Sequence, residues 1–321
     1  MKFFRVKNER GSVLVLALWV MIFFGMMVAV LSARVNSQLG VIRRISEPAS
    51  GRILAYSGTG YVRGLFMEKK PGQTPKLDAN GKEKKPLLSY DWSNNPSIFR
   101  NISLYDGANS TFSIVAGGKS SDIYGVMDEE SKININTISE DIFKKIYASI
   151  QDLTGGDAEL LAKETIKYRE QKGRFDSVEE LLLVPSATAK VLEQLKSYLT
   201  VFGGGQVNLN TVSKSTLMVL GIDGSLAERI LEYRETHTKE TREADESEER
   251  QEAFTGLGDL TQKVHVNAEE EEQLQNVSGL WGAASNTFRF YAMVQTPDGR
   301  VRGGFDCVIN RKGDILFLAN A

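Results

Sequence analysis

The sequence is short of the residues on which most enzyme and metal sites depend. It has one cysteine, Cys307, in 321 residues, so no intramolecular disulfide can form and a cysteine-based zinc site is out of reach. Two histidines, His237 and His265, are too few for a histidine-rich metal centre. No nucleophile motif and no calcium-loop ligand spacing stands out. We therefore expect no catalytic residue, no metal site and no enzyme.

An excess of charge of one sign is also missing. The chain has 39 Lys and Arg against 41 Asp and Glu, so no overall positive field favours nucleic acid. The acidic run over residues 235–252 is expected to be a solvated loop or helix face. That run also disfavours a polyanionic partner.

Charge is absent altogether from Gly11 to Ala33. As a helix this segment would span roughly 34 Å, enough to cross a bilayer. The leader before it holds four basic residues against Glu9 alone, and they are Lys2, Arg5, Lys7 and Arg10. The positive-inside rule then predicts a cytoplasmic N-terminus, with everything after Arg34 on the far side of the membrane.

Three interpretations of this start remain open from the segment alone. A cleaved secretion signal usually has an apolar core of about 7–15 residues and a small-residue cleavage site, which this longer segment lacks. A plain uncleaved anchor is the second. The third is a type IV prepilin-like signal, which the Arg10-Gly11 pair resembles and in which cleavage falls between Gly11 and Ser12. Most pilins have Glu at the fifth mature position, where this chain has Leu16.

The rest of the chain predicts a helix and then a split sheet. Apolar spacing continues a helix over residues 34–70, with Pro48 expected to kink or interrupt it and an apolar stripe resuming at Ile53, Tyr56, Tyr61 and Leu65. Five strand-like runs follow, the last three joined by hairpin-like turns. They are Thr111–Ala116, Ile123–Met127, Thr287–Gln295, Val301–Asn310 and Ile315–Ala319. Strands on both sides of a helical block predict one sheet with an α-helical insertion, and Cys307 is expected in its core.

An internal repeat lies in that block. Lys132–Ile146 and Gln206–Leu220 share an apolar-Asn-apolar-Asn-Thr start, and each copy is followed by a segment ending in Tyr-Arg-Glu. We expect the polar residues of each start to cap the following helices, and they are Asn134, Asn136, Thr137, Asn208, Asn210 and Thr211. Two capping boxes are also predicted, one from Thr137 with Glu140 and one from Ser177 with Glu180.

The block resembles the helix-hairpin-helix module, but without its nucleic-acid chemistry. DNA-binding versions read Gly-hydrophobic-Gly so that backbone N–H groups approach phosphates. This chain has Val184–Thr188 at one such turn, and its other turns, 154–157 and 221–224, each carry an aspartate that would repel phosphate. We expect the repeats to be a packing scaffold.

The order of these features resembles the K-class minor pseudopilins of the type II secretion system (the general secretion pathway protein K family), nearly end to end. The resemblance implies an α+β fold: a pilin-like long N-terminal transmembrane helix packed on an antiparallel β-sheet, with a large inserted α-helical domain built from two helix-hairpin-helix or SAM-like repeats. The expected parts are leader 1–11, transmembrane helix 12–33, helix continuation 34–70, pilin-like loop and first strands 71–130, helical domain 131–280 (repeats near 132–200 and 206–265) and C-terminal hairpins 281–321.

The resemblance also implies a role. It predicts a structural subunit at the pseudopilus tip that initiates assembly and supports protein export, with N-methylation of Ser12 after cleavage by a prepilin peptidase. Expected partners are minor pseudopilins of the I and J types, with H and the major pseudopilin further candidates. The expected place is the inner membrane, with a periplasmic C-terminal domain that is extracted into the pseudopilus. No cofactor is expected, although some family members bind calcium. The alternative is a membrane-anchored helix-hairpin-helix DNA receptor of the competence type.

Overall fold

The computed structural model describes residues 10–66, 89–103, 111–118, 121–150, 153–243, 251–295 and 301–320. Within its helices and strands, the side chains of residues 10–13, 39–52, 89–90, 242–243 and 302 lie outside the description. The expected leader, the loop after the first helix and the turn at 296–299 therefore fall wholly or almost wholly outside it. The chain divides into two compact units, residues 1–53 and 54–321, and each is described by itself.

The described residues form the following elements in chain order: α1 (Arg10–Phe66), α2 (Ser89–Trp92), α3 (Pro96–Phe99), β1 (Thr111–Val115), β2 (Met127–Asp128), the 3-10 helix η1 (Glu129–Ser131), β3 (Ile133–Asn134), α4 (Glu140–Ala148), α5 (Gly155–Lys172), η2 (Val178–Leu183), α6 (Ala189–Leu195), β4 (Leu199–Thr200), β5 (Val207–Asn208), α7 (Lys214–Val219), α8 (Gly224–Glu243), α9 (Leu257–Lys263), α10 (Ala268–Gln275), η3 (Ser278–Leu280), β6 (Trp281–Gly282), β7 (Thr287–Gln295), β8 (Val301–Asn310) and β9 (Ile315–Asn320).

The first unit holds most of helix α1. The helix is unbroken past Pro48, so the expected interruption at this proline is wrong, whereas the expected kink stays a prediction. Proline forfeits one backbone hydrogen bond, and the bonds on either side continue the helix. The stretch Leu14–Gln38 is long and apolar enough to cross a membrane, and its side chains are exposed. By length and composition this helix is a candidate membrane anchor.

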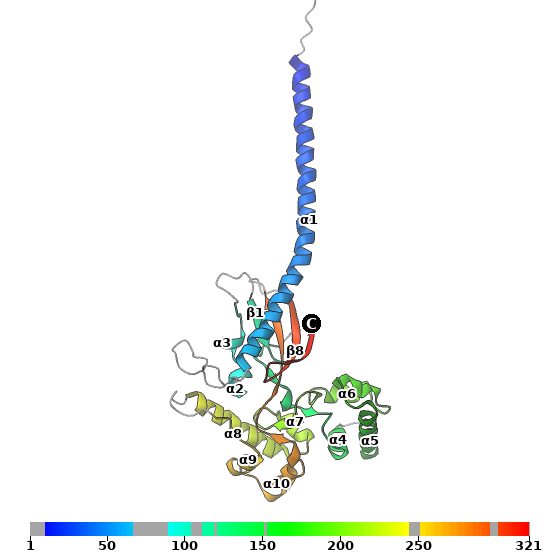
Figure 1. The fold of residues 1–321 in the computed structure, drawn as a ribbon, viewed down its shortest axis with the longest axis vertical. Helices are drawn as coiled ribbons and strands as arrows, with labels where there is room; N and C mark the ends of the chain where they lie inside the picture. The colour runs from blue at the N-terminus through cyan, green and yellow to red at the C-terminus, as the bar shows by residue number, and fades with distance from the viewer. Residues whose placement is uncertain are drawn as a thin grey trace, which may run out of the picture. The chain divides into compact units, whose positions relative to one another are not determined.

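The second unit contains a five-stranded antiparallel sheet with the order β1-β7-β8-β9, and β2 also pairs with β7 (Figure 1). The predicted strands at the C-terminal end are confirmed, as is the strand that begins at Thr111. The predicted strand Ile123–Met127 is wrong. Only Tyr124 bridges to β1, because the N–H of Val126 donates to the carbonyl of Trp92 and the chain turns away before Met127 pairs with β7.

The last three turns of α1 pack on this sheet. Their buried face consists of Ala55, Gly58, Thr59, Val62 and Phe66. The predicted stripe is therefore wrong in detail, since Ile53 and Tyr56 are exposed. Apolar spacing missed the face because two of its members are Gly and Thr. A Cβ on Gly58 would lie 3.1 Å from Ala292 Cβ and from Phe112 Cδ2, so glycine permits this close approach.

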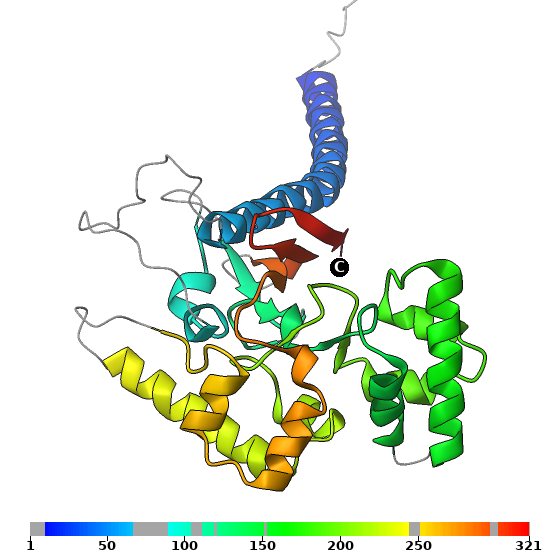
Figure 2. The ribbon, with the colours of Figure 1, turned by 60° about the horizontal axis from the view of Figure 1, so that its bottom comes forward.

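The helical insertion lies between β2 and β7 and has its own buried core, separate from the core under α1. Its helices gather in two groups, α4 to α6 and α8 to α10, which lie apart in both views (Figures 1 and 2). Each group carries one short parallel strand pair, β3 with β4 and β5 with β6. An antiparallel sheet, an apolar N-terminal helix and a helical insertion make this an α+β fold.

Candidate functional site: an acidic junction between the sheet and two helical repeats

Three consecutive acids, Asp128, Glu129 and Glu130, lie buried where the chain leaves the sheet for the helical insertion. Asp128 pairs with Phe288 of β7, and its carboxylate then accepts the N–H of Glu130 at 2.8 Å to start η1. Buried acids are rare unless they are hydrogen-bonded or paired, because a carboxylate loses its hydration on burial. The partners of these three acids therefore define the junction.

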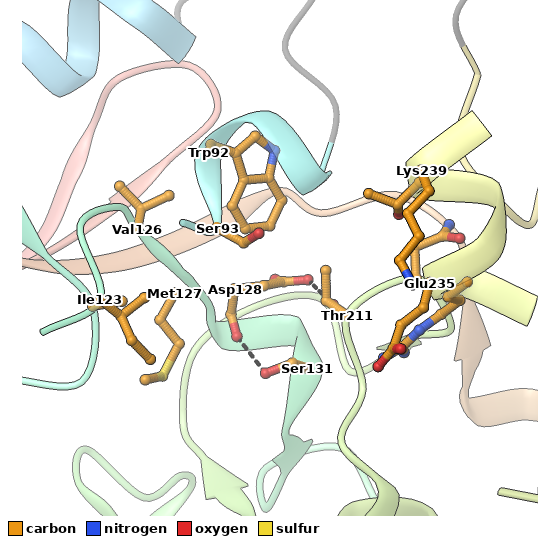
Figure 3. A pocket seen from close by; sticks show the side chains of 14 residues that line it. Trp92, Ser93, Ile123, Val126, Met127, Asp128, Ser131, Thr211, Glu235 and Lys239 are labelled. Atoms are coloured by element: carbon orange, nitrogen blue, oxygen red, sulfur yellow. Dashed lines mark hydrogen bonds between the residues drawn. The ribbon is translucent and has the colours of Figure 1, made fainter. Parts of the chain in front are cut away.

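Asp128 binds the second repeat. Its Oδ2 accepts hydrogen bonds from Asn208 Nδ2 at 3.0 Å and from the hydroxyls of Thr211 and Ser285 at 2.5 Å each, and Figure 3 shows the bond to Thr211. Burial raises the pKa of this carboxyl, and the four hydrogen bonds only partly offset that rise. One buried side chain thus ties the edge of the sheet to the start and to the end of the second repeat.

Glu129 binds the first repeat. Its carboxylate accepts from the Thr200 hydroxyl, lies 3.3 Å from Lys132 Nζ, and lies 3.8 Å from Arg289 Nη1 on β7. Thr200 ends β4, the strand that closes the first repeat. The two neighbouring acids therefore serve different repeats.

Glu130 bridges both repeats. Its Oε1 accepts from the N–H of Gly204 at 3.2 Å, and its Oε2 accepts from the N–H of Asn286 at 2.7 Å. These two N–H groups follow β4 and β6 at matching places, five residues after Leu199 and after Trp281. Burial raises the pKa of Glu130. A Cβ at Gly203, where φ is +86°, would meet Glu130 Cγ at 2.8 Å, which explains the glycine there.

The repeated asparagines clamp loops and do not cap helices. Asn136 accepts from the N–H of Phe175 at 2.7 Å and donates to its carbonyl at 3.0 Å. Asn210 does the same to Phe254, at 2.8 Å for each bond. Because the amide group has both a donor and an acceptor, one side chain satisfies both backbone groups of the facing residue.

The predicted helix caps are therefore wrong. Ser139 caps α4 and Ser213 caps α7, two residues after the Asn-Thr pairs. The side chains named from the sequence instead bond within and across the loops before those helices, and they are Asn134, Asn136, Thr137, Asn208, Asn210 and Thr211. Both predicted capping boxes are absent. Ser139 takes the N-cap position of α4 that the first box assigned to Thr137, and Ser177 precedes a 3-10 helix without a side-chain cap bond. The capping boxes that the structure forms are Thr154 with Asp157 and Asn267 with Glu270.

One arginine in each repeat holds the start of that repeat in place, and sequence reasoning assigned neither arginine a role. Arg169 Nη1 donates to the carbonyls of Ile135 and Ile138 at 2.9 and 2.8 Å. Arg234 Nη1 donates to Leu209 and Val212 at 3.1 and 2.8 Å. Burial lowers the pKa of both, that of Arg234 to about 10. The signal was the doubled Tyr-Arg-Glu, whose arginine stands at the same place in both copies.

Among the described residues, a carboxylate of the chain accepts a backbone N–H group at each of four turns of the insertion. Asp157 accepts from Thr154 at 3.3 Å and Glu164 from Ser186 at 2.9 Å in the first repeat. In the second repeat Asp223 accepts from Ser225 at 2.7 Å and Glu270 from Asn267 at 3.0 Å. Turns of this module that bind phosphate need those N–H groups free. Each of these turns has one backbone N–H group already bonded to a carboxylate of the chain.

A cleft of about 530 Å³ lies beside the junction. One wall is apolar, with Trp92, Ile123 and Val126, and the other comes from α8, with Glu235 and Lys239 (Figure 3). Among the described residues no group of three or more His, Cys, Asp or Glu could hold a metal ion.

The predicted processing site lies at the start of α1. Gly11 and Ser12 are in the helix, with their side chains outside the described residues, and the Leu16 side chain is 66% exposed. Cleavage between Gly11 and Ser12 and methylation of Ser12 stay predictions.

Comparisons with known proteins give three partial likenesses. A model of the helix-hairpin-helix motif matches residues 128–200. Endonuclease/exonuclease/phosphatase family domain-containing protein 1 of Xenopus laevis is 29% identical over 133 residues, which cover 34% of this chain and 22% of that protein. A chain of the GspK-GspI-GspJ complex from the type 2 secretion system of enterotoxigenic Escherichia coli covers 90% of this chain and 99% of its own at 12% identity, with a TM-score of 0.46. A likeness of that degree carries no conclusion about function.

Proposed function

We propose that this chain is a structural subunit of the minor pseudopilin type, of the K class, at the tip of a type II secretion pseudopilus. The observation that carries the proposal is the arrangement around α1: an exposed apolar N-terminal part, and a last part packed on an antiparallel sheet that holds a helical insertion between two of its strands. The buried acids of the junction are engaged by hydrogen bonds within the chain, as befits a scaffold.

The proposed maturation removes residues 1–11 and methylates the amine of Ser12. Leu16 then replaces the glutamate that pilins usually carry, which suits a subunit that joins no existing fibre above it. An unpaired carboxylate in that apolar helix would otherwise be destabilising, because it would lose its hydration. Intact mass after co-expression with a prepilin peptidase tests the proposal, and an unchanged leader contradicts it. Leu16→Glu should still be cleaved, because it leaves Arg10 and Gly11 in place, and should alter assembly only mildly.

The proposed partners are minor pseudopilins of the I and J types, with H and the major pseudopilin following in the fibre. The chain would sit in the inner membrane with its second unit in the periplasm. Neither repeat would have a catalytic role. Co-purification of the full chain with I-type and J-type subunits in detergent tests the partners. A chain that stays alone with both subunits present contradicts this part.

A membrane-anchored DNA receptor is the second candidate, because the helix-hairpin-helix match covers residues 128–200. The carboxylates at four described turns of the insertion weigh against it, since each would repel a phosphate. A gel shift at two salt concentrations separates the candidates, because phosphate contacts weaken steeply with salt. Tight, salt-sensitive binding by the full chain would favour the receptor.

A further inference from the structure

The sheet has two edge strands, and within the described part of the chain only one of them is covered. Along β1, Phe112 and Ile102 exchange two backbone hydrogen bonds of 2.8 and 3.0 Å. Farther along, the N–H of Gly125 donates to the carbonyl of Ile114 at 3.0 Å. Strand β9 pairs with β8 on one side, and no described strand or bridge pairs with its other side.

The open edge of β9 carries only one of the usual protections, a register shift against β8 at Leu316. Natural edge strands carry lysine, proline or inward-pointing charges that block pairing with another chain. The six residues Ile315–Asn320 have no charge, no proline and no glycine. Leu316, Phe317 and Leu318 are 46%, 38% and 38% exposed. Since successive residues of a strand point to opposite faces, both faces of this edge are apolar.

Each face continues into an apolar neighbourhood. Leu318 lies opposite Cys307 of β8, on the face that α1 covers, where the rings of Tyr56 and Phe305 meet with centroids 6.5 Å apart. On the other face the ring of Phe317 lies 6.3 Å from that of Phe202 and 5.9 Å from the Arg289 guanidinium. An added strand would therefore find apolar contacts above and below the sheet.

We propose that the outer edge of β9 binds an extended strand of a partner protein, which adds to the sheet through backbone hydrogen bonds. A helix or a flat surface would cover one face only and would leave the row of backbone N–H and C=O groups desolvated and unpaired, which is unfavourable. A strand satisfies that row and covers both faces. The matching segment is uncharged over about five residues, with β-branched or other apolar-surfaced side chains at successive positions, so that it covers both faces.

This inference deepens the proposed function and rests on it only for the identity of the partner, a neighbouring subunit. The edge itself can be tested with a defined probe. The probe is a fluorescent peptide of alternating valine and threonine with terminal lysines, added to the full chain in detergent micelles and followed by anisotropy. A second peptide of the same sequence carries N-methyl groups on alternate residues, which removes backbone donors and keeps the side chains.

The wild-type chain should bind the first peptide, and Leu318→Lys should weaken binding by about tenfold or more. Met218→Lys is the matched control, because Met218 is 51% exposed but lies on α7, and it should leave binding unchanged. The N-methylated peptide should bind at least about tenfold more weakly, which adsorption to an apolar surface would not cause.

Three results would overturn the proposal: no binding to the wild-type chain, equal binding of both peptides, or equal binding by Leu318→Lys. A fourth overturning result would come from sedimentation of the chain without peptide. Self-association that Leu318→Lys abolishes would show that the occupant of the edge is a second copy of this chain and not a partner protein. The leader experiment stays independent of these results, so a failure of either proposal can be told from a failure of the other.

Discussion

Asp128 and Glu130 are carboxyl groups in surroundings that disfavour their charge, and each is held by groups from elements far apart in sequence. Asp128 collects three side-chain donors from the second repeat, and Glu130 collects two backbone N–H groups, one following each repeat. Burial raises the pKa of both. Single residues therefore set how the sheet and the repeats are joined.

The raised pKa of Asp128 predicts a stability that depends on pH. A carboxyl whose pKa is higher in the folded than in the unfolded state stabilises fully below its unfolded pKa of about 3.9, and this contribution is lost as the pH rises through the folded pKa. Relative to Asp128→Asn, which does not titrate, the wild-type chain should lose free energy of unfolding as the pH rises above about 4. Urea unfolding at several pH values measures the difference. A difference that stays constant would contradict the prediction.

The hydrogen bonds of Arg234 lead to a second prediction, on the free energy of unfolding. Removal of its side chain in Arg234→Ala leaves the carbonyls of Leu209 and Val212 without their donor, which we expect to lower the free energy of unfolding by about 3 kcal/mol. Lys239→Ala on the same helix is the control, because Lys239 is exposed and should change stability by no more than about 0.5 kcal/mol. Equal losses in urea unfolding would show that Arg234 does not hold the repeat start.

At the scale of elements, the sequence predicts the bounds of a strand well where the two-residue alternation of side chains dominates. Strands Thr287–Gln295 and Val301–Asn310 have the predicted bounds because their residues alternate between faces. The prediction fails at Ile123–Met127, where a hydrogen bond from Val126 to Trp92 diverts the chain. It also misassigned the asparagines of the repeats, because propensity favours them as caps and only tertiary contacts show that they clamp Phe175 and Phe254.

The junction could not be derived from the sequence for a related reason. The three acids are separated from their hydrogen-bond partners at the two repeats by 71 to 157 residues, so local spacing carries no trace of these contacts. Sequence reasoning assigned no structural role to the three acids Asp128, Glu129 and Glu130. The duplicated Tyr-Arg-Glu was visible, but the carbonyls that its arginine binds become identifiable only once the two repeats are folded and compared.

Gly58 gives a prediction for the packing of α1 on the sheet. A Cβ placed on Gly58 would lie 3.1 to 3.2 Å from atoms of Ala292, Phe112 and Ile114. Gly58→Val should therefore force the helix away from these residues and lower the free energy of unfolding by about 1–3 kcal/mol. Gly60→Val two residues on meets nothing within 4 Å and should be neutral or slightly stabilising. Thermal unfolding of the two variants provides the comparison. If both variants behave alike, close approach at Gly58 is not what the glycine provides.

The whole chain combines an apolar helix long enough to cross a membrane with a second unit whose buried junction acids are hydrogen-bonded within the chain, so the proposed function depends on which side of the membrane that unit occupies. Four basic residues precede the apolar segment and Glu9 alone opposes them. The charge bias of such short flanks sets orientation, with the basic side retained in the cytoplasm. A scaffold that meets partner subunits outside the cytoplasm needs this orientation, and a reversed one would remove the basis for the proposed function.

Alkaline phosphatase fused after Ala321 should therefore be active, because that enzyme matures only outside the cytoplasm, and a green fluorescent protein fused at the same place should stay dark. Replacing the basic residues Lys2, Arg5, Lys7 and Arg10 by glutamate should reverse the two signals in part of the population, since the bias then favours the opposite orientation. The same replacement in a chain that lacks residues 12–33 serves as the control and should leave both fusions cytoplasmic. If the phosphatase fusion of the wild-type chain is inactive and the green fluorescent protein fusion is fluorescent, the repeats lie in the cytoplasm, where no pseudopilus is assembled.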